Sequence, residues 1–484
     1  MRDLLDRRSF VTGLVGLGAA GSMIASSELE AGAQERRGAT GALPARAEFL
    51  IRDAYILTMD PTLGDIPHGD VHVRNGQIVD VGRNLQAPGV ATIDGRRAIV
   101  LPGLIDTHWH MWTTYLRCLA GDTPEKGYFP VTAACGQVMT PDDMYHGTRL
   151  AAAEAIYSGI TTVSDNCHNI RSHDHAVADI RALKETGTRA RWNYGAFRGM
   201  PDSQGIDMGD VEALQRDWKN YSNDGLLTLG LAWGGVGSTR SPRPKEAVER
   251  ARREFETARG LGIPIAVHLS GRENSGPGEV EAHANGNFLG KDVVLIHVLS
   301  ASPEEMRMVA AGGSPISVSP GSELRIGYGL TKACDFMDAG ILVCVSVDSV
   351  PLTGTASLFG ILKLLRNAEN AKAYNEFKIS ARRALQMATI DGARALGIAD
   401  QVGSLTPGKR ADLIMVSTNV VTMGVFTDPT HMLVEAAEPS NVDTVVVDGR
   451  ILKRGGKFTA LVPDDVIDGA SASLKAVRER ANWS

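Results

Sequence analysis

The protein has 484 residues, of which 43% are hydrophobic and 22% are charged. This composition is typical of a globular chain with one large domain and a smaller companion, and it excludes a disordered, collagen-like or polytopic membrane protein. The formal net charge of -6 gives no basic surface for nucleic acid or anionic lipid. Five cysteines without a Cys-x-x-Cys pair indicate neither a disulfide scaffold nor a zinc finger.

Residues 1–33 have the layout of a secretory signal peptide. Arg7-Arg8-Ser9-Phe10 precedes an apolar run, Val11–Ala25, and Ala31-Gly32-Ala33 offers a cleavage site of small residues. The run is shorter than the about 20 apolar residues that cross a bilayer. The paired arginines resemble a twin-arginine export signal; an amphipathic helix with a chance Arg-Arg pair is the alternative. We expect a periplasmic or secreted protein, free of the membrane after signal removal, with residues 34–46 as a linker.

The hydrophobic pattern of the rest of the chain changes at about residue 100. Residues 47–100 show short alternating apolar runs between turn signals, which predict a small antiparallel β unit. Compact apolar runs then alternate with helical patterns, as in parallel βα units. The runs are Ile99–Ile105, Thr161–Ser164, Ala190–Tyr194, Leu227–Ala232, Ile263–Val267, Val293–Ile296, Pro315–Val318 and Leu342–Val347. The helices between them include Met144–Tyr157, Asp174–Thr186, Pro244–Leu261, Pro303–Ala311 and Leu358–Ala373. Eight such strands predict an α/β fold of the closed (β/α)₈ TIM type.

After the predicted barrel, residues 401–460 return to a β pattern at Ala411–Val416 and Val442–Val447. We therefore expect residues 47–100 and 401–460 to build one small β-sandwich domain together. Residues 101–400 would form the barrel, and residues 461–484 a helical tail. A doubly wound open sheet is the alternative, but such a sheet normally carries a Gly-x-Gly-x-x-Gly turn after its first strand, and none stands there.

Histidines and an aspartate stand where the predicted barrel strands end, which is where such barrels place their chemistry. His108 and His110 form a His-x-His pair, whose imidazoles point to the same side of an extended segment. His268, His297 and Asp348 end the fifth, sixth and eighth runs. Imidazoles with a carboxylate opposite suit Zn²⁺, with Fe²⁺ or Mn²⁺ as alternatives. Buried hydrogen-bonding histidines without a metal are the other interpretation.

Two motifs resemble those of the amidohydrolase superfamily. Leu101-Pro102-Gly103-Leu104-Ile105-Asp106-Thr107-His108-Trp109-His110 resembles its opening motif, and Gly403-Ser404-Leu405-Thr406-Pro407-Gly408-Lys409-Arg410-Ala411-Asp412-Leu413 its closing motif. The nearest branch is that of the cytosine deaminases and triazine chlorohydrolases. The resemblance implies one divalent metal ion, held by His108, His110, His268 and Asp348. Binuclear relatives in this superfamily carry a carboxylated Lys on strand four. The predicted fourth strand contains no Lys, so the resemblance implies a mononuclear site.

A divalent ion with three His and one Asp supplies an activated water at neutral pH. Asp348 would then move the nucleophile's proton to the leaving group, and His297 would polarise the carbon under attack. We expect hydrolysis of a C–N bond in a small amide, urea, carbamate or cyclic amide. Hydrolytic deamination or dehalogenation of an N-heterocycle is the alternative. A non-enzymatic interaction protein on the same scaffold is the third hypothesis.

Four further residues are candidate substrate contacts, each with a packing or solvated role as the alternative: Trp112, His168, Trp233 and Glu323. Many members of the resembling branch carry Glu three residues after the strand-five His, where it protonates a ring nitrogen. Gly271 stands there in this chain, with Glu273 and Glu323 as the candidates to replace the missing acid. This gap disfavours nucleobase deamination. We expect a small-molecule substrate as partner and no nucleic acid. A homo-oligomer is compatible with the sequence.

Overall fold

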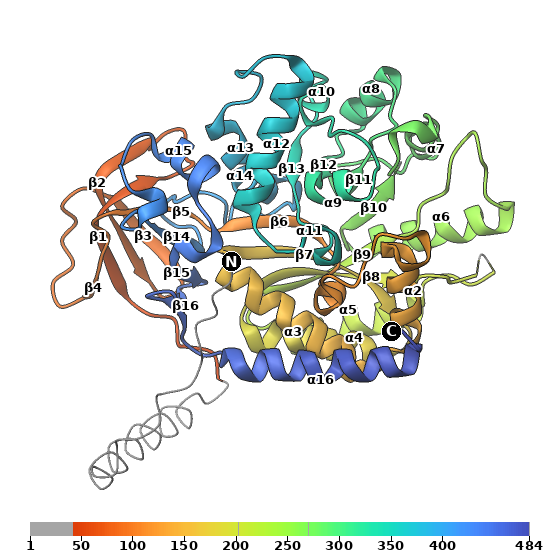
Figure 1. Ribbon diagram of the computed structural model, residues 1–484, viewed down its shortest axis with the longest axis horizontal. Coiled ribbons are helices and arrows are strands. Elements are labelled where there is room, and N and C mark those ends of the chain that lie inside the picture. The colour runs from red at the N-terminus through yellow and green to blue at the C-terminus, as the bar shows by residue number, and fades with distance from the viewer. Residues whose placement is uncertain (1–41, 202, 270, 484) are drawn as a thin grey trace, which may run out of the picture. The chain divides into compact units, whose positions relative to one another are not determined.

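The computed structural model describes residues 42–201, 203–269 and 271–483 (Figure 1). The predicted signal peptide and residues 34–41 of the predicted linker lie outside the described residues. Within the described ranges, no helix combines the length and the apolar character that a bilayer-crossing segment requires.

Eight parallel strands form one sheet in the order β13-β12-β11-β10-β9-β8-β7-β6. They are β6 (Leu104–Trp109), β7 (Ile160–Ile170), β8 (Arg189–Ala196), β9 (Leu227–Trp233), β10 (Ile265–Leu269), β11 (Val293–His297), β12 (Ile316–Val318) and β13 (Val343–Val345). A parallel bridge between Trp109 and Asp348 joins the two ends of this order. The predicted TIM-type barrel is therefore confirmed, and the open doubly wound alternative is wrong.

Helices follow the strands and cover the outside of the barrel (Figure 1). The α-helices are α2 (Tyr128–Val138), α3 (Pro141–Tyr157), α4 (His173–Thr186), α5 (Met208–Arg216), α6 (Lys245–Gly260), α7 (Glu279–Asn285), α8 (Pro303–Gly312), α9 (Pro320–Arg325), α10 (Ala333–Asp338), α11 (Val350–Thr353), α12 (Leu358–Ala373), α13 (Ala381–Met387), α14 (Ile390–Ala395), α15 (Pro429–His431) and α16 (Pro463–Ala481). All five predicted helices are present within three residues of their predicted ends.

A second, nine-stranded sheet combines the N- and C-terminal segments, as predicted. Its strands are β1 (Phe49–Leu57), β2 (Asp65–Arg74), β3 (Gln77–Gly82), β4 (Ala91–Asp94), β5 (Ala98–Pro102), β14 (Leu413–Ser417), β15 (Val442–Val447), β16 (Arg450–Arg454) and β17 (Lys457–Phe458). The antiparallel pairing of β5 with β14 joins the two halves. Buried apolar side chains from both segments, among them Phe49, Val71 and Leu413, pack into one core.

The predicted first barrel strand, Ile99–Ile105, needs correction because its residues belong to two sheets. β5 ends at Pro102 in the nine-stranded sheet, and β6 begins at Leu104 in the barrel. Gly103 separates them, and a Cβ at this position would lie 2.0 Å from the Thr161 Oγ1 atom. Only glycine permits this approach of the chain to β7, so the continuous apolar run hides a change of sheet.

The C-terminal helix α16 lies alongside α3 (Figure 1). Ser473 donates a hydrogen bond of 2.6 Å to the Asp143 carboxylate near the start of α3. Arg480 pairs with the same carboxylate and donates to the Val138 carbonyl at 3.0 Å. These contacts attach the tail to the outside of the barrel.

Lys453 is a buried cation on β16. Its Nζ donates to the Tyr157 backbone carbonyl at 2.7 Å and lies 3.9 Å from the centroid of the Tyr157 ring. Burial lowers the pKa of Lys453 to about 8, against about 10.4 in an unfolded chain. Charging this amine therefore destabilises the fold fully below about pH 8, and the penalty is lost progressively as the pH rises from about 8 to about 10.4.

We predict that Lys453→Met changes the pH dependence of stability. The free energy of unfolding of the variant, relative to wild type, will fall by roughly 1–3 kcal/mol between pH 7 and pH 10.5, because only wild type is relieved of the buried charge. Thermal unfolding at both pH values measures this difference. Lys457→Met, at an exposed position of β17, is the control. A difference that does not change with pH would contradict the prediction.

Candidate metal centre

Strand β6 presents its histidines from a buried backbone. Asp106 accepts hydrogen bonds from the backbone N–H of His108 at 3.0 Å and of Val347 at 2.8 Å, which ties the end of β6 to the segment after β13. Burial raises the pKa of Asp106 to about 8. The Asp348 N–H donates to the His108 carbonyl at 2.9 Å, and the His110 N–H donates to the Asp348 carbonyl at 2.7 Å. The barrel's closing seam thus positions both histidines and Asp348.

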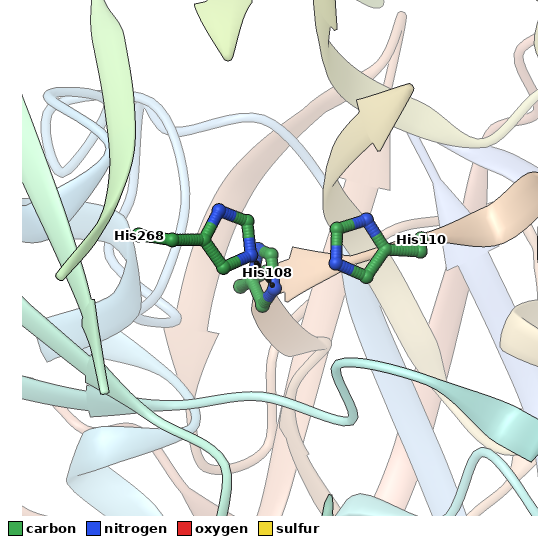
Figure 2. Close-up of side chains that lie close together, drawn as sticks. All are labelled: His108, His110 and His268. Carbon is green, nitrogen blue, oxygen red and sulfur yellow. Dashed lines mark hydrogen bonds between the residues drawn. The ribbon is translucent and has the colours of Figure 1, made fainter. Parts of the chain in front are cut away.

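The structure brings the four predicted ligands together at the carboxyl ends of the strands. The His108 Nε2 atom lies 3.1 Å from Asp348 Oδ1 and 3.2 Å from His268 Nε2. The His110 Nε2 atom lies 3.4 Å from the same carboxylate oxygen. The rings of His268 and His110 stand on two sides of His108 (Figure 2), with their planes 7° apart.

These separations fit a divalent cation. Zinc–nitrogen bonds of about 2.0–2.1 Å in a tetrahedron place neighbouring ligand atoms about 3.3 Å apart. The measured separations of 3.1, 3.2 and 3.4 Å bracket this edge length. In addition, His108 Nε2 and His268 Nε2 face each other, and a shared cation satisfies both lone pairs. Two overlapping groups that share His108 could each hold a metal ion: His108 with His110 and His268, and His108 with His297 and Asp348.

The protonation states favoured by the surroundings suit a cation. His110 donates from Nδ1 to the Asn166 carbonyl at 2.9 Å, which leaves Nε2 as the acceptor facing the group. Burial, together with neighbouring imidazoles, lowers the pKa of His110 and of His268. Burial opposes ionisation of Asp348, but its contact with His108 lowers its pKa overall. Neutral imidazoles and an ionised carboxylate are the ligand forms.

Asp348, and His297 beside the group, both have a left-handed backbone conformation. His297 and Asp348 have φ values of 70° and 64°, in the left-handed region that L-residues rarely adopt. Each such conformation costs about 1–3 kcal/mol and persists only where the surroundings enforce it. The backbone hydrogen bonds of Asp348 with His108 and His110 enforce this conformation. The conformational strain at Asp348 therefore lowers the stability of the fold and orients its carboxylate.

His297 lies beside the group and is held by Glu323. The His297 Nδ1–H donates to Glu323 Oε1 at 3.0 Å, and the Ser319 N–H donates to the same oxygen at 2.8 Å. Burial disfavours charge on His297, but the Glu323 bond and the charge of Asp348 raise its pKa. His297 also forms an overlapping group with His108 and Asp348, whose ligand atoms lie within 4.8 Å of one another.

Glu323 contacts His297 directly, and its predicted role as a substrate contact stays a prediction. Its side chain is fully buried on α9 behind the His297 ring. A carboxylate that bonds Nδ1 fixes the tautomer and orientation of an imidazole. Glu323 is therefore a positioning residue for His297.

We predict that Glu323→Gln lowers kcat roughly 10- to 100-fold while the chain stays folded, because the neutral amide can offer the His297 Nδ1 atom a donor and reverse its tautomer. Steady-state kinetics and circular dichroism measure both effects. Glu305→Gln, which also replaces a buried carboxylate that accepts backbone N–H groups, should leave turnover unchanged. Equal turnover in Glu323→Gln and wild type would contradict the role of Glu323.

The two predicted tryptophan contacts lie in packed surroundings. Trp233 donates its indole N–H to the Ala251 carbonyl of α6 at 3.0 Å and packs on Phe255 and Phe288. It fills the layer between β9 and α6, and a substrate contact of Trp233 stays a prediction. Trp112 is 2% exposed, and its ring lies against Gly136 of α2. A substrate contact of Trp112 stays a prediction.

His168 joins the histidine group, with its ring centroid 5.3 Å from that of His110 and 5.2 Å from that of His268. Among the described residues its buried Nε2 atom has no hydrogen-bond partner, which leaves it available to a ligand. Its role as a substrate contact stays a prediction. Glu273 is half exposed and pairs with Lys332 at 3.8 Å. Sequence reasoning missed Tyr328, whose ring centroid lies 5.9 Å from that of His297.

Comparison with protein families gives one match over most of the chain: residues 99–452 match the amidohydrolase family. A curated relative, the 5'-deoxyadenosine deaminase of Methanosarcina mazei, is 27% identical over 452 residues, which cover 90% of this chain and 100% of that protein. The 5-methylthioadenosine/S-adenosylhomocysteine deaminase of Acetivibrio thermocellus is 28% identical over 86% of this chain and 96% of that protein.

Solved structures share the fold. A zinc-bound adenosine deaminase from Xanthomonas campestris superposes with a TM-score of 0.77 at 22% identity, covering 90% of this chain and 100% of that one. An atrazine chlorohydrolase from Arthrobacter aurescens, complexed with zinc, gives a TM-score of 0.76 at 24% identity, covering 88% and 100%. At these identities the likeness establishes the architecture, a barrel with its small β domain.

Proposed function

Because this chain belongs to the amidohydrolase family, we propose that it is a zinc-dependent hydrolase that cleaves a C–N bond of a small carbonyl compound: an amide, urea, carbamate or cyclic amide. The observation that carries the proposal is the cluster of His108, His110, His268 and Asp348, in which three ligand-atom separations of 3.1, 3.2 and 3.4 Å match the edge of a zinc tetrahedron. Zinc-bound structural relatives support this metal. When bound, zinc supplies a water activated at neutral pH.

The protein's own residues would perform the proton transfers and stabilise charge. Asp348, ionised and within reach of the ligand nitrogens, would take the proton from the attacking water and pass it to the leaving nitrogen. His297, oriented by Glu323, would hold the developing negative charge on the substrate oxygen. The burial of both side chains strengthens these electrostatic interactions.

Deamination of an aminopurine nucleoside is the second candidate. The deaminase names of the curated relatives favour it, whereas the missing side chain at Gly271 disfavours it. The deciding experiment is a panel of amides, ureas, carbamates, cyclic amides and aminopurine nucleosides, incubated with zinc-loaded protein. Selective hydrolysis of the carbonyl compounds supports the first function. Ammonia release from the nucleosides alone supports the second, and no turnover of either class contradicts both.

We also propose that the protein is exported, on the support of the twin-arginine motif and the predicted cleavage site near residue 33. Replacing Arg7 and Arg8 together by Lys keeps the charge and removes the guanidinium groups. We expect this double variant to accumulate in the cytoplasm, as cell fractionation and immunoblotting will measure. Unchanged export would argue against the twin-arginine route, and an N-terminus of the exported protein far from Gln34 against the cleavage site.

A further inference from the structure

Gly271, just beyond β10, is covered by an aromatic ring. A Cβ at this position would lie 2.6 Å from Cε2 and 3.1 Å from Cζ of Tyr328. Contacts this short do not occur between a real Cβ and a ring, so any side chain at residue 271 would displace Tyr328. The Tyr328 ring thus occupies the space that a side chain at residue 271 would fill.

The backbone holds Tyr328 in place from both sides. Its N–H donates to the Glu323 carbonyl at 2.8 Å, and its carbonyl accepts from the Glu273 N–H at 2.8 Å. The residues before and after it, Gly327 and Gly329, have φ values of 73° and 136°, which L side chains rarely adopt. This Gly-Tyr-Gly turn links α9 to the loop after β10 and fixes the backbone from which the ring projects.

The Tyr328 ring also borders the candidate metal centre. It stands edge to face with the His297 imidazole, at a centroid distance of 5.9 Å and an interplanar angle of 87°. Burial raises the pKa of Tyr328, and the negative charge of Asp348 raises it further. A phenol has an ordinary pKa of about 10, so it is a neutral hydrogen-bond donor at pH 7.

We propose that Tyr328 determines which substrates this site accepts: its ring walls the site between Gly271 and His297, and its O–H donates a hydrogen bond to the substrate carbonyl oxygen. This inference rests on the proposed hydrolase function. It assigns planar carbonyl compounds as the substrate class, because their oxygen accepts such a bond without receiving the proton. Substrates that need full protonation of a weakly basic ring nitrogen gain little from a neutral phenol.

Tyr328→Phe tests the hydrogen bond, because it removes one oxygen and keeps the ring against Gly271. We expect kcat/KM for the best carbonyl substrate of the panel to fall about 10- to 100-fold, with unchanged zinc content. Tyr145→Phe, which removes a phenol from the outer helix α3, should change neither quantity. A purely structural Tyr328 would tolerate Phe, so kcat/KM within twofold of wild type overturns the proposal.

A double-mutant cycle with Gly271→Ala tests the contact itself. In wild type, the added methyl group displaces the ring, and we expect at least a tenfold loss of kcat/KM. In the Tyr328→Ala background the space is empty, and the same methyl group should cost less than threefold. Equal losses in the two backgrounds would show that Gly271 does not act through Tyr328 and would overturn the contact.

A binding measurement separates this inference from the proposed function. Acetohydroxamic acid carries a carbonyl oxygen and binds zinc, so calorimetric titration of zinc-loaded protein reads the site without turnover. We expect Tyr328→Phe to bind it about 5- to 50-fold more weakly than wild type. If wild type hydrolyses nothing in the panel but shows this difference, the proposed function fails and the role of Tyr328 stands. Equal affinities, or no binding to wild type, overturn that role.

Discussion

His108→Ala and Asp348→Ala should each remove hydrolysis almost completely, by at least about 10³-fold in kcat/KM, and should each lower the affinity for zinc. The His108 Nε2 atom is the centre of the group, within 3.2 Å of both Asp348 and His268. In the described part of the chain, Asp348 provides the only carboxylate that contacts both His108 and His110. Removing either leaves an incomplete ligand set.

Neither substitution should unfold the barrel, because the side chains stand at strand ends rather than in the apolar core. Elemental analysis, circular dichroism and steady-state kinetics of the purified variants measure the three effects. His173→Ala is the matched control: that imidazole lies on α4, is half exposed and pairs with Asp210. Near wild-type turnover of metal-depleted Asp348→Ala would contradict the assigned centre.

Sequence patterns predicted the architecture because each barrel strand is a short buried run bounded by a helix pattern. The length of such a run cannot show to which sheet its residues belong. Ile99–Ile105 is continuous in sequence, yet Gly103 divides it between two sheets, and the reason is the close approach of Thr161. This contact joins residues 58 positions apart, and the Pro102-Gly103 dipeptide is the local signal that marks the break.

The ligand positions were predictable for a similar reason: alternation in an extended His-x-His segment puts His108 and His110 on one side, and parallel strands end at one rim. Residues that act through another side chain could not be predicted from the sequence. Glu323 was identified as a polar residue after the seventh run, but only the fold shows that it faces His297. Tyr328 lies in a Gly-Tyr-Gly segment outside every periodic run, and no local pattern indicates that it covers Gly271.

Free cytosine, adenine and guanine should be poor substrates, with kcat/KM at least about 10²-fold below that of the best amide, urea or carbamate. Hydroxide attack on an amino-substituted ring carbon places negative charge on the neighbouring ring nitrogen unless an acid protonates it. A positioned acid contributes about 10²- to 10⁴-fold, and position 271 offers no carboxyl group. Opening a carbonyl C–N bond depends less on such an acid, because charge develops on oxygen beside His297 and Asp348 protonates the leaving nitrogen.

Ammonia release from each nucleobase, measured beside the carbonyl panel with the same zinc-loaded preparation, tests this discrimination. The argument fails if any free nucleobase is deaminated with kcat/KM of about 10⁴ M⁻¹s⁻¹ or more, the ordinary range for a natural substrate. Glu273 would then become the candidate acid, because it follows Gly271 by two residues and its side chain is half exposed. Glu273→Gln would abolish that deamination if its carboxyl group supplies the proton, and would leave it unchanged if the proton comes from His297.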